Sequence, residues 1–146
     1  MSSAPETPAV VTRRLGYLLK HAQLRLAELQ EPLLAPHGVT GRQVAVLALL
    51  ADGEPQSQQE AAARLGVDRT TMVQLVDELE DKALVRRHVD PADRRRRIVT
   101  PTEEGLRVLK AATEASEEAE RRLLGPLAGR EADALREVLW AVVHHR

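Results

Sequence analysis

The sequence predicts a mainly α-helical fold, with six helices and one small β-hairpin between the fourth helix and the fifth. Three observations predict it. Apolar residues recur every three or four positions, several of these stretches open on a capping motif, and one segment instead carries β-branched residues on both sides of a proline turn. With 146 residues, 43% of them hydrophobic, the chain can bury a core.

The first predicted helix follows a polar, proline-containing tail and ends near Pro36-His37-Gly38. Its apolar residues recur at helical spacing: Leu15, Leu18, Leu19, Ala22, Leu26, Leu29 and Leu33. The second helix follows Thr40, which can form a capping box with Gln43, and it stops at Asp52-Gly53. In such a box the two side chains accept hydrogen bonds from backbone N–H groups that would otherwise lack partners.

Ser57 and Glu60 repeat the capping box before a short third helix, and Gly66 can adopt the left-handed conformation that ends it. Asp68 can cap the fourth helix. The inward stripe of that helix is Met72, Leu75, Val76 and Leu79. Because the third and fourth helices meet through a very short turn, residues 58–75 predict a helix-turn-helix, with an ordinary helical hairpin as the alternative.

The hairpin is predicted from β-branched residues on both sides of a polar centre: Val85, Val89, Ile98 and Val99. Asp90-Pro91 favours the turn between the strands. A fifth helix begins near Thr100, with Pro101 at its first position, or near Thr102, which is an equally suitable cap. The sixth helix begins at about Gly129.

Polar residues lie on the outward face at the start of the fourth helix, where a helix-turn-helix contacts the major groove. They are Arg69, Thr70, Thr71 and Gln74. Arginine can bind guanine through two hydrogen bonds, glutamine can bind adenine, and threonine can contact a phosphate or a thymine methyl group. At the start of the third helix, Ser57, Gln58 and Gln59 can bind a phosphate, although capping and solvation alone would explain them equally well.

Residues 86–97 hold six arginines and two aspartates, a formal charge of +4, whereas the whole chain carries −1. A basic hairpin directly after a helix-turn-helix predicts a wing that contacts the minor groove, because a narrow minor groove attracts arginine. We expect Arg95 and Arg96 at the tip to enter or follow that groove, and Asp93 to orient Arg94 through a bidentate ion pair. A solvated arginine-rich loop is the alternative.

Four segments carry a more specific pattern. They are Gly66-Val67-Asp68-Arg69-Thr70-Thr71-Met72-Val73-Gln74-Leu75-Val76-Asp77-Glu78-Leu79, Leu84-Val85-Arg86-Arg87, Asp90-Pro91-Ala92-Asp93-Arg94-Arg95 and Thr102-Glu103-Glu104-Gly105. Together they resemble the DNA-binding core of the MarR (multiple antibiotic resistance regulator) family. The chain departs from the family at Pro101, where leucine is usual, and at Ala83, where glycine is usual and a left-handed alanine would cost about 1 kcal/mol.

The resemblance implies a winged helix-turn-helix fold in a homodimer whose first and last helices intertwine. Residues 1–37 and 103–146 would form the helical dimerisation region, and residues 38–102 the winged DNA-binding lobe. It also implies binding to a pseudo-palindromic operator in double-stranded DNA, with repression relieved by a small, often aromatic, effector.

Three residues of the first predicted helix are candidates for binding that effector. Tyr17 and His21 would share one face of the helix, with Arg14 one turn earlier, near the place where the family's pocket lies. Such a group could hold a phenol or a carboxylate. An ordinary surface or interface histidine is the alternative for His21.

Other classes of function find little support in the sequence. The absence of cysteine excludes disulfides, thiolate metal sites and cysteine nucleophiles. Without a glycine-rich phosphate loop, a G-x-S-x-G elbow or a zincin motif, we expect neither an enzyme nor a bound metal or cofactor. No apolar run is long enough for a membrane span and the N-terminus does not resemble a signal peptide, so we expect a cytoplasmic protein.

The sequence also allows two functions other than regulation. One is a protein-interaction module that uses a winged-helix scaffold, and the other is an architectural DNA binder that responds to no ligand.

Overall fold

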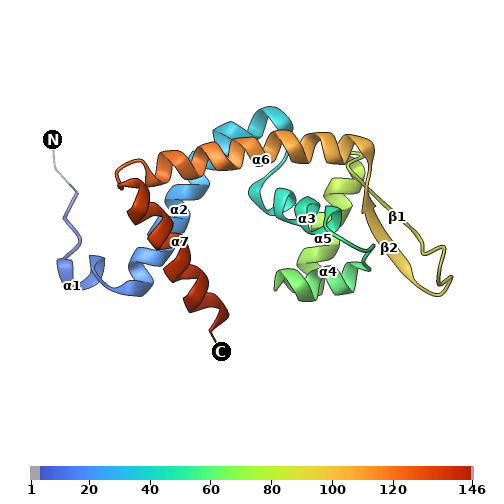
Figure 1. The fold of residues 1–146 in the computed structure, drawn as a ribbon, viewed down its shortest axis with the longest axis horizontal. Coiled ribbons are helices and arrows are strands. Elements are labelled where there is room, and N and C mark those ends of the chain that lie inside the picture. The colour runs from blue at the N-terminus through green and yellow to red at the C-terminus, as the bar shows by residue number, and fades with distance from the viewer. Residues whose placement is uncertain (1–3, 146) are drawn as a thin grey trace. The chain divides into compact units, whose positions relative to one another are not determined.

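The structure, a computed structural model, describes residues 4–145 (Figure 1). Within this range it has seven α-helices, one 3₁₀ turn and a two-stranded antiparallel sheet. The helices are α1 (Ala9–Thr12), α2 (Leu15–Leu34), α3 (Gly41–Ala51), α4 (Gln58–Leu65), α5 (Arg69–Asp81), α6 (Glu103–Leu124) and α7 (Gly129–His144). The 3₁₀ turn η1 is Ala35–His37, and the strands are β1 (Val85–Val89) and β2 (Arg97–Pro101).

The mainly helical fold with one hairpin is therefore confirmed, and the six predicted helices correspond to α2–α7. The additional helix, α1, is a single turn inside the predicted tail. The N–H groups of Val11 and Thr12 both donate to the carbonyl of Pro8, at 2.9 and 3.1 Å, and this closes the turn. The first long helix also ends slightly earlier than predicted, at Leu34, because the chain tightens into η1 before Gly38 takes a φ of 71°.

The chain forms two compact units. One is Gln30–Glu117 and contains α3, α4, α5 and both strands. The other combines residues before Gln30 with residues after Glu117, and contains α1, α7, most of α2 and the end of α6. The predicted lobe of residues 38–102 lies inside the first unit; its bounds stay a prediction.

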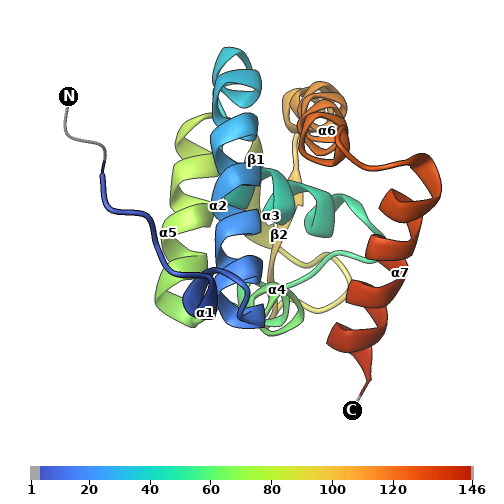
Figure 2. The same ribbon diagram turned by 90° about the vertical axis from the view of Figure 1, so that its left-hand side faces the viewer.

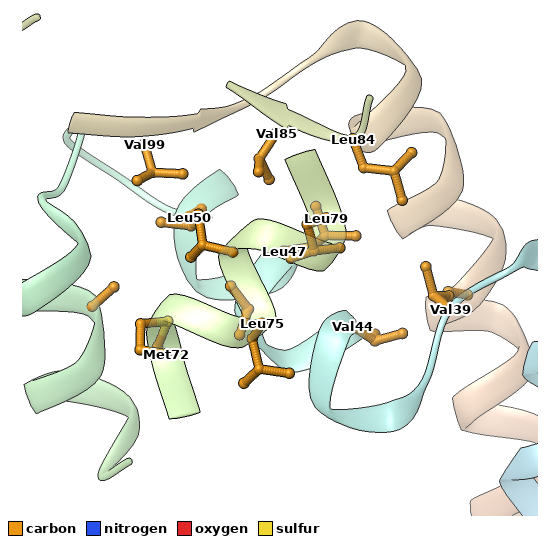
Figure 3. Packing of buried hydrophobic residues seen from close by; sticks show 14 of the residues in the cluster. Val39, Val44, Leu47, Leu50, Met72, Leu75, Leu79, Leu84, Val85 and Val99 are labelled. Carbon is orange, nitrogen blue, oxygen red and sulfur yellow. The ribbon is translucent and has the colours of Figure 1, made fainter. Parts of the chain in front are cut away.

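The unit Gln30–Glu117 is built around one hydrophobic core (Figure 3). All four residues of the stripe predicted for α5 are buried, and they pack with apolar residues of α3 and of the hairpin. Members of this core include Val46, Leu47, Leu50, Met72, Leu75, Val76, Leu79, Val85 and Val99. Helices α3, α4 and α5 lie together with the two strands in this body (Figure 2), so the burial of apolar surface fixes the angle between α4 and α5.

Both predicted capping boxes are present. The Thr40 hydroxyl accepts from the N–H of Gln43, and the Gln43 side chain accepts from the N–H of Thr40, both at 3.2 Å. Ser57 and Glu60 make the same reciprocal pair at 3.1 and 3.3 Å. Gly66 ends α4 with a φ of 73°, as its position predicted. These local contacts set where α3 and α4 begin and where α4 ends.

The hairpin pairs Val85 with Pro101 and Val89 with Arg97. Pro101 is thus the last residue of β2, so the alternative in which it opens the following helix is wrong. Thr102 is the cap: its hydroxyl accepts from the N–H of Gly105 at 3.0 Å and donates to the carbonyl of Ala83 at 2.7 Å. The backbone N–H of Thr102 is also occupied, by the carbonyl of Leu84, which extends the pairing past the strand end.

Ala83 has the left-handed conformation that the sequence suggested, with a φ of 60°. It stands at the turn between α5 and β1, where its N–H donates to the carbonyl of Glu80 at 2.9 Å. The turn accepts an alanine at the cost of backbone strain. Nearby, Gly105 could not be replaced: a Cβ there would lie 2.0 Å from the carbonyl oxygen of Leu84.

Among residues 4–145, no single helix has the length and apolarity of a membrane span. Within that range one bent pair, Leu15–His37 with Gly41–Ala51, meets the criterion when its two helices are taken together across a 69° bend.

Candidate nucleic-acid interface

The turn between α4 and α5 is held by Asp68, the N-cap of α5. One Asp68 oxygen accepts from the N–H of Thr71 at 2.7 Å and the other from the Thr71 hydroxyl at 3.0 Å. The backbone hydrogen bond from Thr71 is the main reason that the pKa of Asp68 lies below its usual value. The predicted contact residue Thr71 therefore has its hydroxyl engaged in the cap.

The outer face of α5 presents the other predicted contact residues to solvent. Arg69, Thr70 and Gln74 are all exposed: Thr70 and Gln74 lie on the side opposite the buried stripe, and Arg69 is the first residue of the helix. Val73 lies on the same face, and its side chain is 40% exposed. Sequence reasoning missed Val73, although its position outside the stripe of Met72, Leu75, Val76 and Leu79 was a usable signal.

The three predicted phosphate contacts at the start of α4 differ in their environments. Gln59 is exposed, whereas Ser57 is half-buried and its hydroxyl serves the capping box. The Gln58 side-chain oxygen accepts from the Nε and one Nη of Arg87, at 3.3 and 3.0 Å. Gln58 is therefore part of an internal contact between α4 and β1.

Arg87, which the sequence analysis did not single out, joins the two helices of the motif to the hairpin. Besides Gln58, its guanidinium donates to Asp77 at 2.5 Å and to Glu80 at 2.9 Å, both on α5. Its backbone N–H also donates to Glu80, at 3.2 Å. One planar group thus orients β1 against α4 and α5 through hydrogen bonds in fixed directions.

The tip of the hairpin, residues 90–96, is ordered by its own backbone. The N–H of Asp90 donates to the carbonyl of Arg96 at 2.8 Å, and the N–H of Arg96 donates to the carbonyl of Asp93 at 2.9 Å. The Asp93 carboxylate accepts from the backbone N–H of Arg95 at 3.1 Å. Within the described chain Asp93 makes no ion pair with Arg94, so the expected bidentate pair is wrong: Asp93 is occupied by the turn.

Arg96 turns back toward the body of the unit. Its guanidinium forms ion pairs with Glu60 on α4 and, at 3.3 Å, with Asp90, and it donates to the carbonyl of Pro55 at 3.3 Å. The hydrogen bond from Arg96 is the main cause of the lowered pKa of Glu60, and Glu60 in turn raises the pKa of Arg96. Arg96 therefore fastens the wing to α4 in this structure.

Four other arginines of the hairpin are exposed: Arg86, Arg94, Arg95 and Arg97. Arg94 and Arg95 lie in the tip, and Arg86 and Arg97 lie on the strands. Their positive charge is available to an anionic partner on the same unit that carries the outer face of α5 (Figure 1).

The candidate effector residues lie in the other unit. Tyr17 and His21 stack, with ring centroids 3.9 Å apart, which confirms that they share a face of α2. Arg14 lies in the break between α1 and α2, where its carbonyl accepts the first hydrogen bond of α2 from Leu18 at 3.0 Å. Tyr17 and His21 therefore lie together on α2, and Arg14 lies just before the helix begins.

A helix-turn-helix followed by a basic β-hairpin, on a core that fixes the angle between its helices, defines a winged-helix DNA-binding protein. Residues 37–96 match the model of the MarR family. The HTH-type transcriptional repressor NicR of Pseudomonas putida is 34% identical over 128 residues, which cover 86% of this chain and 81% of that protein. The chain belongs to the MarR family of transcriptional regulators.

Solved structures of similar proteins have the same fold along nearly the whole length of this chain. The transcriptional repressor CouR bound to a 23-mer DNA duplex has a TM-score of 0.87 at 33% identity, covering 97% of this chain and 100% of that one. CouR from Rhodococcus jostii RHA1 bound to p-coumaroyl-CoA has a TM-score of 0.81 at 29% identity, covering 95% and 98%.

Proposed function

We propose that this regulator is a homodimeric repressor that binds a pseudo-palindromic operator, with α5 in the major groove and the wing on the adjacent minor groove. The observation that carries the proposal is the outer face of α5, where Arg69, Thr70 and Gln74 are exposed beside a wing whose Arg94 and Arg95 are exposed as well. The relative CouR, which has the same fold, has been solved on duplex DNA. Base contacts from α5 would supply sequence preference, and the wing arginines would supply phosphate and groove contacts.

The dimer is supported by apolar side chains that the single chain leaves exposed in the unit of α1, α2 and α7. They include Leu15, Leu18 and Leu19 on α2, and Leu135, Val138, Leu139, Trp140, Val142 and Val143 on α7. Exposed apolar residues in such number on neighbouring turns are typical of a surface that a partner covers. We propose that this partner is a second copy, with residues 1–37 and 103–146 as the dimerisation region.

The signal that releases the operator would be a small aromatic compound. The relative CouR was solved with p-coumaroyl-CoA, the thioester of an aromatic acid. In this chain the stacked rings of Tyr17 and His21 offer an aromatic surface, and Arg14 immediately precedes the same helix. We propose these three residues as part of the effector site, in a cytoplasmic protein that performs no catalysis.

The test is equilibrium binding of the protein to a fluorescent duplex from the region upstream of its own gene, at several salt concentrations and with a panel of aromatic acids and their thioesters. We expect affinity to fall steeply with salt, because phosphate contacts release counterions. Arg69→Ala should relax the preference for the operator over random duplex, whereas Arg95→Ala should weaken binding to both about equally.

The two alternative functions predict different results in this binding experiment. No binding to the duplex even in dilute buffer would favour a protein-interaction module. Equal affinity for operator and random duplex, with no response to any ligand, would favour an architectural DNA binder.

A further inference from the structure

A chain of hydrogen bonds runs from the outer face of α5 into the protein and ends at the turn before α3. The exposed Gln74 donates through Nε2 to one carboxylate oxygen of Glu78 at 3.3 Å. The other oxygen of Glu78 accepts from Nε2 of Gln43 at 2.8 Å. Glu78 thus stands between a surface amide that faces the DNA side and an amide inside the lobe.

Gln43 cannot rotate freely, because its other amide atom is also held. It is only 3% exposed, and its Oε1 accepts from the N–H of Thr40 at 3.2 Å and from Nζ of Lys82 at 2.8 Å. The Lys82 ammonium donates in addition to the carbonyl of Gly38 at 2.6 Å. Since two donors fix Oε1, the Nε2 of Gln43 must point at Glu78, and that carboxylate is held in place.

A carboxylate only accepts hydrogen bonds, so it selects one orientation of the Gln74 amide. Turning that amide over would bring its oxygen against the Glu78 oxygen, which is repulsive. With one hydrogen of Nε2 directed at Glu78, Gln74 presents one acceptor, Oε1, and one remaining N–H to the outside.

One acceptor and one donor match the major-groove edge of adenine, which offers the N6 amino group as donor and N7 as acceptor. Guanine presents two acceptors, N7 and O6, and would need both hydrogens of Nε2. We propose that Glu78, held by Gln43, is a positioning residue that orients Gln74 to accept adenine and to reject guanine at one position of each half-site. The inference rests on the proposed docking of α5 in the major groove.

The isosteric variant Glu78→Gln tests the proposal. Its side chain keeps an acceptor oxygen on one side only and carries a donor NH₂ group on the other. Because the Gln43 amide is fixed by Thr40 and Lys82, the oxygen must face Gln43, so the new NH₂ group faces Gln74 and turns its amide over. The matched control is Asp81→Asn, which removes the same charge from the same helix at an exposed residue outside the chain of hydrogen bonds. Gln74→Ala identifies the base pair concerned, and thermal unfolding of each variant confirms that the lobe is folded.

The experiment begins by selecting bound sequences from random duplexes with the wild-type protein. Affinities are then measured for the selected duplex and for one with A·T changed to G·C at the position that Gln74→Ala alters. We expect the wild type and Asp81→Asn to prefer adenine by about tenfold or more, and Glu78→Gln to lose most of that preference while binding the G·C duplex as well as the wild type does.

Two results would overturn the proposal: full discrimination by Glu78→Gln, or a position governed by Gln74 that does not favour adenine. Both leave DNA binding intact. Failure of the proposed function would look different, because the wild-type protein would then select no common sequence at all.

Discussion

At the scale of single residues, Ala83 is a place where the chain carries avoidable strain. Its φ of 60° suits glycine, and an alanine there costs about 1 kcal/mol, part of which the greater freedom of glycine in the unfolded chain offsets. We expect Ala83→Gly to raise the free energy of unfolding by about 0.5 kcal/mol, measured by urea denaturation of the purified protein.

Gly66→Ala provides the opposite case for the same measurement. Gly66 has a φ of 73°, and an added Cβ would meet nothing within 4 Å, so the cost is backbone strain, partly offset by the smaller freedom of alanine in the unfolded chain. The free energy of unfolding of this variant should fall by about 0.5 kcal/mol. If Ala83→Gly were destabilising while Gly66→Ala behaved as expected, the strain at Ala83 would have been overstated.

The position of Val73 on the outer face of α5 suits it to contact a base. It is a 40% exposed valine next to Thr70 and Gln74 on the outer face of α5, and the methyl group of thymine is the apolar feature of the major groove. We expect one thymine in each selected half-site to lose about fivefold or more in affinity when it is replaced by deoxyuridine. Val73→Ala should bind both duplexes alike; an equal loss in this variant would assign the methyl contact to another residue.

At the scale of elements, the wing is fastened to α4 through Arg96 and Glu60. Glu60→Gln keeps a side-chain oxygen for the capping box and removes the charge that pairs with Arg96. We expect the tip, which contains Arg94 and Arg95, to open more often, so trypsin should cleave there several-fold faster than in the wild type. Glu54→Gln, an exposed acid with no such partner in the described chain, should leave the rate unchanged.

The same ion pair gives the wing a dependence on pH. The pKa of Glu60 is lowered in the folded protein, so its contribution is complete above the ordinary value of 4.5 and is lost as the pH falls through the lowered value. Amide exchange at Arg96 should therefore be slower in the wild type than in Glu60→Gln near neutral pH. The difference should vanish in acid; a difference that persisted there would show that charge is not its cause.

Elements were predictable from the sequence where their causes are local. The capping boxes at Thr40 and Ser57 involve residues three positions apart, and the stripe on α5 follows from helical spacing alone. The partners of the arginines were not predictable, because Arg96 pairs with Glu60 from 36 positions away and Arg87 joins Gln58 across 29. Such contacts exist only after the core has brought α4 beside the hairpin. The prediction of an Asp93–Arg94 ion pair was wrong for a related reason, because the Asp93 carboxylate accepts a hydrogen bond from the backbone of the turn.

At the scale of the whole molecule, DNA affinity should depend on a surface far along the sequence from the wing. Val138 and Val142 are 59% and 65% exposed on α7, on the apolar face that we assign to the dimer. Val138→Glu would bury a charge at that interface, so we expect the variant to be monomeric in analytical ultracentrifugation.

Each winged lobe would then bind alone, so the operator affinity of Val138→Glu should fall by at least a hundredfold. Because a single lobe contacts half the phosphates, the slope of log affinity against log salt should also fall to about half. Arg130→Glu, a charge change on an exposed residue of the same helix, controls for net charge. A monomeric variant that kept the full salt slope would mean that one chain makes all the phosphate contacts, and the two-lobed model of operator binding would have to be abandoned.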